Sequence, residues 1–297
     1  SYPDKPVHLY VPYPAGGPND VIARLLGQKL SDSLGQQVVI ENRPGGSGNI
    51  AIESLARTSA DGYTIALPAM AYATNPSLFS KVGYGFDQFA AVSIVTKGPL
   101  VVVVHPSLGV TSIKELIALA KSKPGKLDYG SGGNGTSPHL AAEMFKQQAG
   151  VDIQHIPYKG TNDLISDLLT GRVPISFMSP LIAKSHVDQG KLLALGVTSA
   201  KRSESWPNTP TVAEAGVPGY AVEAWYAVVA PKGTPKDVVE KLNREIAKAV
   251  QSAEVKEKFA TLGNESVGSS VAEAERYIAE EADRWGKLLK ANNIRAD

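Results

Sequence analysis

Hydrophobic and polar positions follow two different spacings along the 297-residue chain. Residues 7–11 (VHLYV) alternate with a period of two and predict a strand, which the proline- and glycine-containing stretch at 12–18 ends. From Val21 to Leu30 apolar residues recur at helical spacing, and Gly35 predicts the end of that helix. This succession of strand, loop and helix is repeated along the chain and predicts an α/β fold with largely parallel sheets. Further strands are predicted at residues 38–40, 63–67 and 92–95, and a helix start at Ser47.

Other helix starts are indicated by a hydroxyl residue followed three positions later by an acidic one. The hydroxyl accepts a hydrogen bond from a free backbone N–H of the first turn. Such pairs begin at Ser112, Thr211, Thr234 and Ser270. We interpret them as folding signals and assign them no chemistry.

Two long apolar segments predict strands that cross between two lobes. Residues 100–105 (LVVVVH) are rich in β-branched side chains, as in a strand buried on both faces, and residues 223–230 (EAWYAVVA) form a second such strand. We therefore expect a discontinuous first lobe, residues 1–100 with 224–297, and a second lobe, residues 101–223.

Composition excludes several classes of protein. Apolar residues make up 43% and charged residues 20%, too much hydrocarbon for a disordered chain. The 30 Lys and Arg nearly balance the 29 Asp and Glu, which disfavours nucleic acid and polybasic membrane binding. No apolar run approaches the roughly 18–20 residues that cross a bilayer. The absence of cysteine excludes disulfides, thiolate metal sites and cysteine nucleophiles.

Three glycine-rich segments are candidates for ligand contact: residues 15–17, 44–48 and 130–135. The first and third follow a predicted strand and open a helix, where unpaired backbone N–H groups favour an anion. Thr136 and Ser137 add hydroxyl donors. Glycine-rich turns are also the ordinary connection in α/β chains, and both interpretations stay open.

The segment from Gly130 to Gly135 also matches the dinucleotide pattern G-x-G-x-x-G. A Rossmann site needs an acidic residue at the end of the next strand, but that strand ends in Tyr158 and Lys159, and Asp152 precedes it. An enzyme that binds a nucleotide or phosphorylated substrate through this loop is the alternative hypothesis.

Catalytic and metal-binding patterns are absent from the sequence. The five histidines lack zinc-ligand spacing, and no G-x-S-x-G motif occurs. His139 either donates to a bound carboxylate or packs at the start of its helix. Asp20, Asp163 and Asp167 lie near helix starts, where the helix dipole is sufficient to explain them. We therefore expect no catalytic residue, no metal and no cofactor.

Segments in order along nearly the whole chain resemble one family, the solute receptors of tripartite tricarboxylate transporters (Bug or TctC type). These blocks include VPYPAGGPNDVIARLL, ENRPGGSGNIA, ADGYTIAL, GSGGNGTSPHLAAEMF, IPYKGTNDLISDLL, NTPTVAEAG and WYAVVAPKGTP. The resemblance implies a two-lobed periplasmic binding protein fold of type II with two crossing hinge strands. It also implies a non-catalytic receptor that holds a small organic carboxylate in the cleft and passes it to a membrane permease.

Site residues follow from the same resemblance. The loops at 12–17 and 134–137 would bind a carboxylate through N–H groups, hydroxyls and ordered water. The residue at 13 and the segment around 69 would line the pocket. The YKG loop, which ends at Thr161, would contribute from the second lobe. The expected ligand-binding residues are Tyr13, Ala15, Gly16, Gly17, Ala69, Asn134, Gly135, Thr136, Ser137, His139 and Thr161.

The sequence leaves the ligand's far end open, because Thr161-Asn162-Asp163 departs from the small residues or proline that follow YKG in many relatives. Tyr13, Tyr72, Phe79, Phe177, Trp225 and Tyr226 are either a stacking surface for an aromatic acid or ordinary core and hinge packing. We expect a monomer with no nucleic-acid partner. The chain starts at Ser1, as a secreted chain whose signal peptide was removed or a trimmed fragment would.

Overall fold

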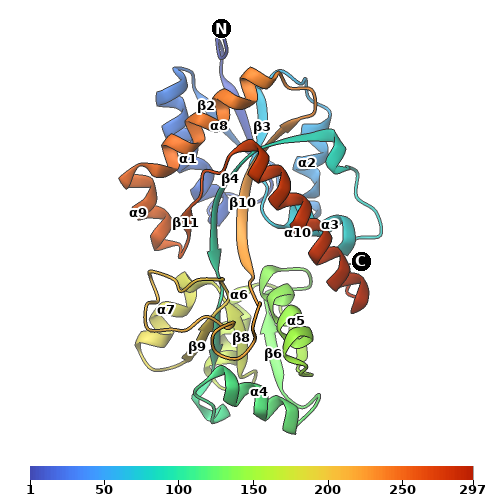
Figure 1. The fold of residues 1–297 in the computed structure, drawn as a ribbon, viewed down its shortest axis with the longest axis vertical. Helices are drawn as coiled ribbons and strands as arrows, with labels where there is room; N and C mark the ends of the chain where they lie inside the picture. The colour runs from blue at the N-terminus through green and yellow to red at the C-terminus, as the bar shows by residue number, and fades with distance from the viewer. Residues whose placement is uncertain (297) are drawn as a thin grey trace. The chain divides into compact units, whose positions relative to one another are not determined.

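The computed structural model describes residues 1–296, and its internal contacts divide the chain into two compact units. Unit 1 comprises Ser1–Lys97 and Trp225–Asp297, and unit 2 comprises Gly98–Ala224. The sequence predicts lobe boundaries at 100/101 and 223/224, and the boundaries between the two units lie at 97/98 and 224/225. The chain leaves unit 1 within strand β4 (Phe89–Pro99) and returns within β10 (Glu223–Pro231), the neighbouring strand in the sheet of unit 1 (Figure 1). That these units are the lobes of a receptor stays a prediction.

A six-stranded mixed sheet forms the centre of unit 1, in the order β11-β4-β10-β3-β1-β2. β1 pairs in parallel with both β2 and β3, whereas β10 is antiparallel to β3 and β11 is antiparallel to β4. The strands not yet given are β1 (Val7–Val11), β2 (Val38–Asn42), β3 (Thr64–Ala66) and β11 (Glu265–Ser266).

Helices cover both faces of this sheet. One hydrophobic cluster joins β1 to α1, α8 and α9, and α10 packs against α3 on the other face (Figure 1). The helices are α1 (Pro18–Leu34), the short η1 (Gly46–Gly48), α2 (Asn49–Ala56), α3 (Ala71–Leu78), η2 (Phe86–Gln88), α8 (Lys236–Gln251), α9 (Ala253–Thr261) and α10 (Val271–Ala291).

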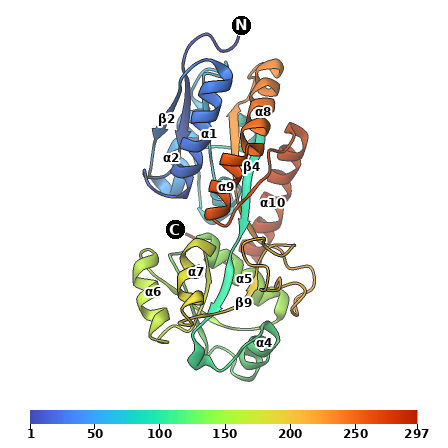
Figure 2. The same cartoon turned by 90° about the vertical axis from the view of Figure 1, so that its left-hand side faces the viewer.

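Unit 2 is built around a five-stranded sheet in the order β7-β6-β8-β5-β9. All four valines of β5 are fully buried, as expected for a strand covered on both faces. Helices α6 and α7 lie on one side, and α4 and α5 on the other (Figure 2). The elements are β5 (Val101–Val104), η3 (Pro106–Leu108), α4 (Ile113–Ser122), β6 (Asp128–Ser131), α5 (Ser137–Ala149), β7 (Gln154–Pro157), α6 (Thr161–Leu169), β8 (Ile175–Met178), α7 (Pro180–Asp188) and β9 (Leu193–Val197).

Both sheets repeat one strand order. In unit 1, β1 lies between β2 and β3, and in unit 2, β6 lies between β7 and β8. The next strand in each sheet, β10 beside β3 and β5 beside β8, comes from another part of the chain. This arrangement agrees with the expected α/β fold. Both sheets are mixed rather than wholly parallel, because β5, β10 and β11 pair antiparallel with at least one neighbour.

Of the four helix starts predicted from a hydroxyl and an acidic residue, two are confirmed and two are wrong. Ser112 and Ser270 cap their helices as expected. Thr211 exchanges hydrogen bonds with Glu214, but no helix follows. The Thr234 hydroxyl donates to the Pro231 carbonyl, and α8 begins two residues later. Ser47 lies inside η1, so α2 starts after it.

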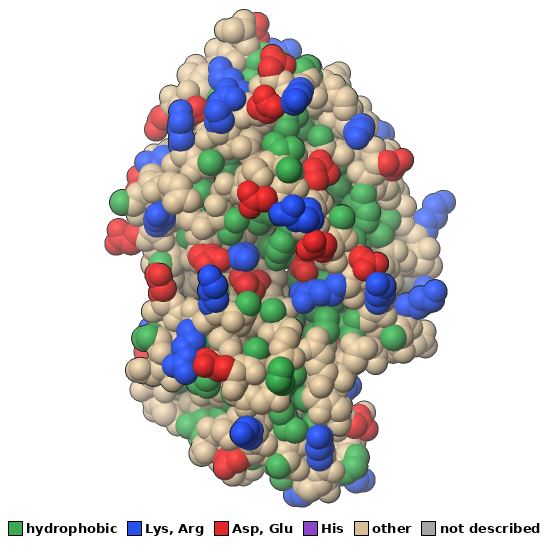
Figure 3. Space-filling model, in the orientation of Figure 1, with side chains coloured by type: hydrophobic (Ala, Val, Ile, Leu, Met, Phe, Trp, Pro, Cys, Tyr) green, Lys and Arg blue, Asp and Glu red, His purple; other side chains and the backbone are tan. Residues whose placement is uncertain are grey.

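Charges of both signs are mixed over the face shown in Figure 3, as the net charge of +1 suggests. Among residues 1–296, no helix combines the length and the apolar character needed to span a membrane. The same residues contain no cluster of three metal-ligating side chains.

Candidate functional site

The two glycine loops occupy equivalent positions in the two units. From β1 the chain continues to β2 on one side and then to β3 on the other, and from β6 it continues to β7 and then to β8. Such a reversal opens a crevice at the carboxyl ends of the strands, where α/β proteins bind ligands. We call residues 12–17, after β1, the first loop, and residues 132–137, after β6, the second loop.

A buried carboxylate holds the first loop. Asp20 is 5% exposed and accepts hydrogen bonds from the Gly16 N–H at 2.9 Å, from Arg24 Nε at 3.0 Å and from Asn42 Nδ2 at 3.1 Å. Asn42 also donates to the Tyr13 carbonyl. Burial alone would raise the pKa of Asp20, but these hydrogen bonds outweigh it and lower the pKa. Asp20 is therefore charged, and it fixes the loop directly at Gly16 and, through Asn42, at Tyr13.

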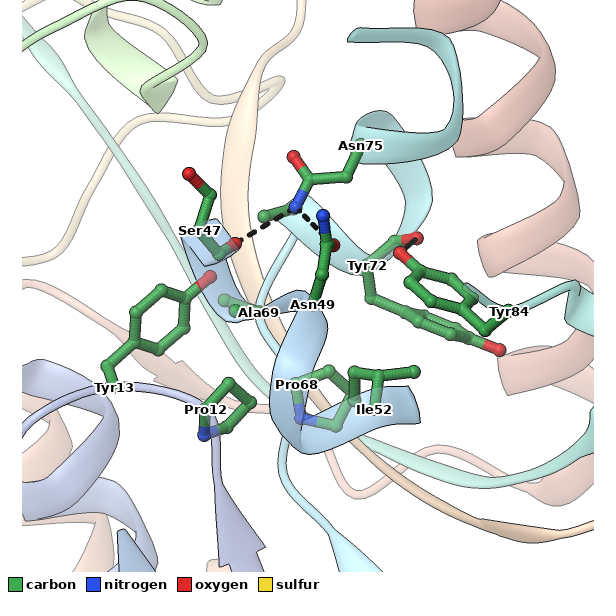
Figure 4. A pocket seen from close by; sticks show the side chains of 12 residues that line it. Pro12, Tyr13, Ser47, Asn49, Ile52, Pro68, Ala69, Tyr72, Asn75 and Tyr84 are labelled. Atoms are coloured by element: carbon green, nitrogen blue, oxygen red, sulfur yellow. Dashed lines mark hydrogen bonds between the residues drawn. The ribbon is translucent and has the colours of Figure 1, made fainter. Parts of the chain in front are cut away.

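A small uncharged pocket lies beside the first loop in unit 1 (Figure 4). Asn75 and Asn49 are buried there, and Asn75 Nδ2 donates to both the Ser47 carbonyl and Asn49 Oδ1 at 2.9 Å. The Tyr72 and Tyr84 rings stack at 5.7 Å on one side. No Lys, Arg, Asp or Glu lines the pocket, whose lining is Pro12, Tyr13, Ser47, Gly48, Asn49, Ile52, Pro68, Ala69, Ala71, Tyr72, Asn75 and Tyr84.

The ring of Tyr13 depends on a missing side chain at Gly48. A Cβ on Gly48 would lie 3.0 Å from the Tyr13 hydroxyl oxygen and 3.2 Å from Cζ. Gly48 has φ +93°, and its neighbour Ser47 has φ +57°, an uncommon backbone conformation for a residue with a side chain. Burial and the nearby Tyr226 raise the pKa of Tyr13, so its phenol is a neutral donor.

The second loop is held by neutral side chains. The Gly133 N–H donates to Ser131 Oγ at 3.1 Å, and the Gly135 N–H donates to His139 Nδ1 at 3.0 Å. The Thr136 hydroxyl donates to the Gly133 carbonyl at 2.8 Å. No acid lies in the first turn of α5. The partial positive charge that the helix dipole places at the start of α5 is therefore not compensated by an acidic side chain.

Several backbone N–H groups of the two loops have no acceptor within residues 1–296. In the first loop and the start of α1 these are the N–H groups of Ala15, Gly17, Asn19 and Asp20; in the second loop and the start of α5 they are those of Asn134, Ser137 and His139. The Gly16 and Gly135 amides, which we expected to face a ligand, are already paired inside the protein.

The other expected site residues fall near these loops. Tyr13 and Ala69 line the same pocket of unit 1. Thr161 Oγ1 lies 3.8 Å from the position of a Cβ on Gly132, and the Gly160 N–H donates to the Gly132 carbonyl at 3.3 Å, so the YKG loop contacts the second loop. His139 is 5% exposed, and its Nδ1 is occupied by Gly135.

Sequence reasoning missed the polar part of the pocket in unit 1. Ser47 belongs to the glycine-rich segment at 44–48, which we singled out but did not assign to the site, and Asn49 follows this segment directly. Asn75 has no local signal because its partners lie 26 and 28 residues earlier in the chain. Of the proposed aromatic surface, Phe177 and Trp225 are fully buried in the cores, whereas Tyr13 and Tyr72 line the pocket.

Comparison with known proteins identifies the family. The model of the "Tripartite tricarboxylate transporter family receptor" matches residues 22–294. The solved structure of Rpa4515 from R. palustris with adipate is 37% identical, covers 99% of both chains and has a TM-score of 0.84. The periplasmic binding protein BugD is 32% identical over 99% of both chains, with a TM-score of 0.78. MatC from Rhodopseudomonas palustris with bound malate is 27% identical, covering 97% of this chain and 100% of its own, with a TM-score of 0.79.

These matches confirm the resemblance found in the sequence and the expected α/β fold of a periplasmic binding protein. The chain belongs to the family of tripartite tricarboxylate transporter receptors, which are periplasmic solute-binding proteins.

Proposed function

We propose that this protein binds a small organic carboxylate, aliphatic or aromatic, in the periplasm and delivers it to the permease subunits of a tripartite tricarboxylate transporter. Family membership supports a receptor, and two related structures contain adipate and malate. The observation that carries the carboxylate is the set of unpaired N–H groups at the starts of α1 and α5, each at a strand-order reversal.

Neutral donors are sufficient for such a ligand. Hydrogen bonds from N–H groups to a charged acceptor are roughly twice as strong as those between neutral groups, and helix dipoles add about 0.3–1 kcal/mol each. In the proposal, each unit offers N–H donors to a carboxylate: those of Ala15 and Gly17 in the first loop, and those of Asn134 and Ser137 in the second, where the donors of Thr136 already bind the Gly133 carbonyl. The uncharged lining near Tyr13 and Ala69 suits the uncharged part of the ligand.

The alternative of a nucleotide-dependent enzyme has less support. Two glycine amides of the second loop, those of Gly133 and Gly135, are paired within the protein, which leaves few donors for a diphosphate. The strand after this loop, β7, ends at Pro157 with no acidic residue for a ribose. We therefore propose a receptor without catalytic activity.

The first test is a thermal-shift screen at pH 7.5 with adipate, malate, benzoate, phthalate and NAD(P), followed by calorimetry. A carboxylate present at about 100 times its Kd should stabilise the protein by roughly 2.7 kcal/mol, and NAD(P) should have no effect. Stabilisation by NAD(P) alone, or turnover of a bound acid, would contradict the proposal.

Replacement Ser137→Trp tests the second loop directly. The indole would cover the N–H groups at the start of α5, and we expect carboxylate binding to fall at least 100-fold while the circular dichroism spectrum stays unchanged. Ser122→Trp, at an exposed position at the end of α4, is the matched control and should bind as the wild type does. Equal affinity of both variants would remove Ser137 from the site.

A further inference from the structure

Three rings from three elements of unit 2 form a stack behind the second loop. Tyr129 of β6 lies 5.1 Å from His155 of β7, and His155 lies 3.8 Å from His139 of α5 with only 7° between the ring planes. His139 is 5% exposed, and Tyr129 is fully buried. His139 and Tyr129 therefore lie in the interior, whereas His155 between them is half-buried.

Both histidines in this stack are tied to the backbone of the second loop. His139 Nδ1 accepts the Gly135 N–H at 3.0 Å. His155 Nε2 lies 2.6 Å from Ser131 Oγ, and this hydroxyl is hydrogen-bonded to both the N–H and the carbonyl of Gly133 at 3.1 Å. The two imidazoles thus fix the loop at Gly133 and Gly135, on either side of Asn134, whose N–H has no acceptor in the described chain.

We propose that His139 is a positioning residue for carboxylate binding, and that it holds the second loop in its binding conformation only while its imidazole is neutral. The inference rests on the proposed function, because it concerns the same loop. It assigns His139 an action through Gly135 in place of direct contact with the ligand.

The chemistry of imidazole requires the neutral form. In a protonated imidazole both nitrogens are donors, so Nδ1 could no longer accept the Gly135 N–H. The His139 and His155 rings are 3.8 Å apart, so a positive charge on one disfavours protonation of the other. With Nδ1 as the acceptor, the neutral ring carries its proton on Nε2.

The surroundings of the pair favour the neutral state. Burial lowers the pKa of His139 to about 4, and the ammonium of Lys146 adds to this effect. Burial likewise lowers the pKa of His155 to about 4, with contributions from His139 and Lys146 that outweigh the opposing carboxylate of Glu143. Glu143 is itself paired with Lys146 at 3.0 Å and accepts from the Tyr129 hydroxyl at 2.5 Å, so the facing charges nearly cancel.

The sign of the resulting pH effect distinguishes positioning from charge attraction. If His139 contacted the anion directly, its protonation would strengthen binding at acid pH. If it positions the loop, protonation releases Gly135 and weakens binding. The two roles therefore predict opposite changes below about pH 5.

Calorimetric titration with adipate and with malate from pH 7.5 to pH 4 tests this prediction in three proteins: wild type, His139→Asn and His139→Leu. Asparagine places Oδ1 where Nδ1 lies and keeps an acceptor for Gly135 that does not titrate, whereas leucine removes the acceptor. His186→Asn, on α7, is the control for loss of a histidine elsewhere in unit 2. Because the acids titrate too, affinities are compared as ratios between proteins at each pH.

At pH 7.5 we expect His139→Leu to bind at least 10-fold more weakly than the wild type, and His139→Asn to bind within about 3-fold of it. The ratio of wild-type to His139→Asn affinity should stay constant above pH 6 and fall by about 2-fold at pH 4, where about half of the His139 side chains are protonated. Nitrogen chemical shifts of the free protein should show His139 unprotonated at Nδ1 at pH 7.5.

Three results would overturn the inference: His139→Leu binding as tightly as the wild type, a wild-type to His139→Asn ratio that rises at acid pH, or a proton on His139 Nδ1. If His139→Leu does not fold, the other two measurements still decide. Failure of the wild type to bind any carboxylate would instead overturn the proposed function, and the inference with it.

Discussion

The first and second loops lie at equivalent points of their sheets but are held in chemically different ways. In unit 1 a carboxylate, Asp20, gathers the Gly16 N–H, Arg24 and Asn42. In unit 2 the same task falls to Ser131 and His139, which are uncharged when they bind Gly133 and Gly135. In both units a side-chain acceptor beneath the loop binds its glycine amides, and either a carboxylate or neutral side chains can serve.

The difference has consequences for charge. Asp20 places a negative charge in the first turn of α1, where it already compensates the helix dipole, and Arg24 balances that charge from the exposed side. The start of α5 carries no acid. Of the two helix starts, that of α5 is therefore the more favourable for a carboxylate.

The largest expected effect is the loss of the carboxylate under the first loop. Asp20→Ala leaves the Gly16 N–H and Asn42 without their acceptor and should lower the free energy of unfolding by about 2–4 kcal/mol, because hydrogen bonds to charged groups contribute roughly 1.5–3 kcal/mol each and are not additive. Urea unfolding measures this change.

Arg24→Met is the matched control for Asp20→Ala. The Arg24 side chain is 57% exposed, so its ion pair should contribute less than about 1 kcal/mol. Equal losses in the two variants would mean that the ion pair, rather than the hydrogen bonds to the loop, stabilises unit 1.

Acid should destabilise unit 2 before unit 1. His139 has a pKa near 4 in the folded protein and 6.5 when unfolded, so between these values the unfolded chain binds more protons and the stability falls with decreasing pH. The loss from this group is at most about 1.4 kcal/mol per pH unit and ends below pH 4. The pKa of Asp20 is instead lowered from 3.8, so its contribution is lost only below that pH.

Hydrogen exchange of the α5 and α1 amides at pH 7, 5.5 and 4.5 separates the two units. Protection of α5, corrected for the intrinsic exchange rate, should decrease over this range, and His139→Asn should reduce the decrease. A decrease of equal size in α1, or none in α5, would contradict the assignment of neutral histidines to unit 2.

Much of the fold could be predicted from local patterns. Alternation in β1, the helical spacing and terminal Gly35 of α1, and the uniformly buried valines of β5 each depend on residues close in sequence. The exceptions are non-local or depend on a competing bond. The pairing of β11 with β4 joins residues about 170 positions apart. The Thr234 hydroxyl donates to the Pro231 carbonyl and does not cap the helix that follows.

The candidate site was predictable to the level of the loops but not of individual atoms. Glycine spacing pointed to the first and second loops, and the family resemblance added Tyr13, Ala69 and Thr161. Neither indicates which amides are already paired, because this depends on side chains such as His139 and Asp20 folding back onto their own loops. The contact between Asn75 and Ser47 required the tertiary structure.

The smallest expected effect compares two glycines with nearly equal backbone angles, Gly16 at φ +95° and Gly48 at φ +93°. Alanine at either position is strained by about 1–2 kcal/mol. A Cβ at Gly16 meets no atom within 4 Å, whereas one at Gly48 lies 3.0 Å from the Tyr13 hydroxyl. Gly48→Ala should therefore cost about 1 kcal/mol more in free energy of unfolding than Gly16→Ala.

The extra cost of Gly48→Ala should depend on Tyr13, and a double-mutant cycle with Tyr13→Phe measures this dependence. Removing the hydroxyl relieves the closest contact, while Cζ at 3.2 Å remains, so only part of the cost should be recovered. Gly16→Ala should show no coupling to Tyr13→Phe, because nothing in unit 1 lies close to that Cβ. If the two alanine variants lose the same stability and neither couples to Tyr13, the phenol does not pack over Gly48 in solution, and the pocket in unit 1 has a different wall from the one described above.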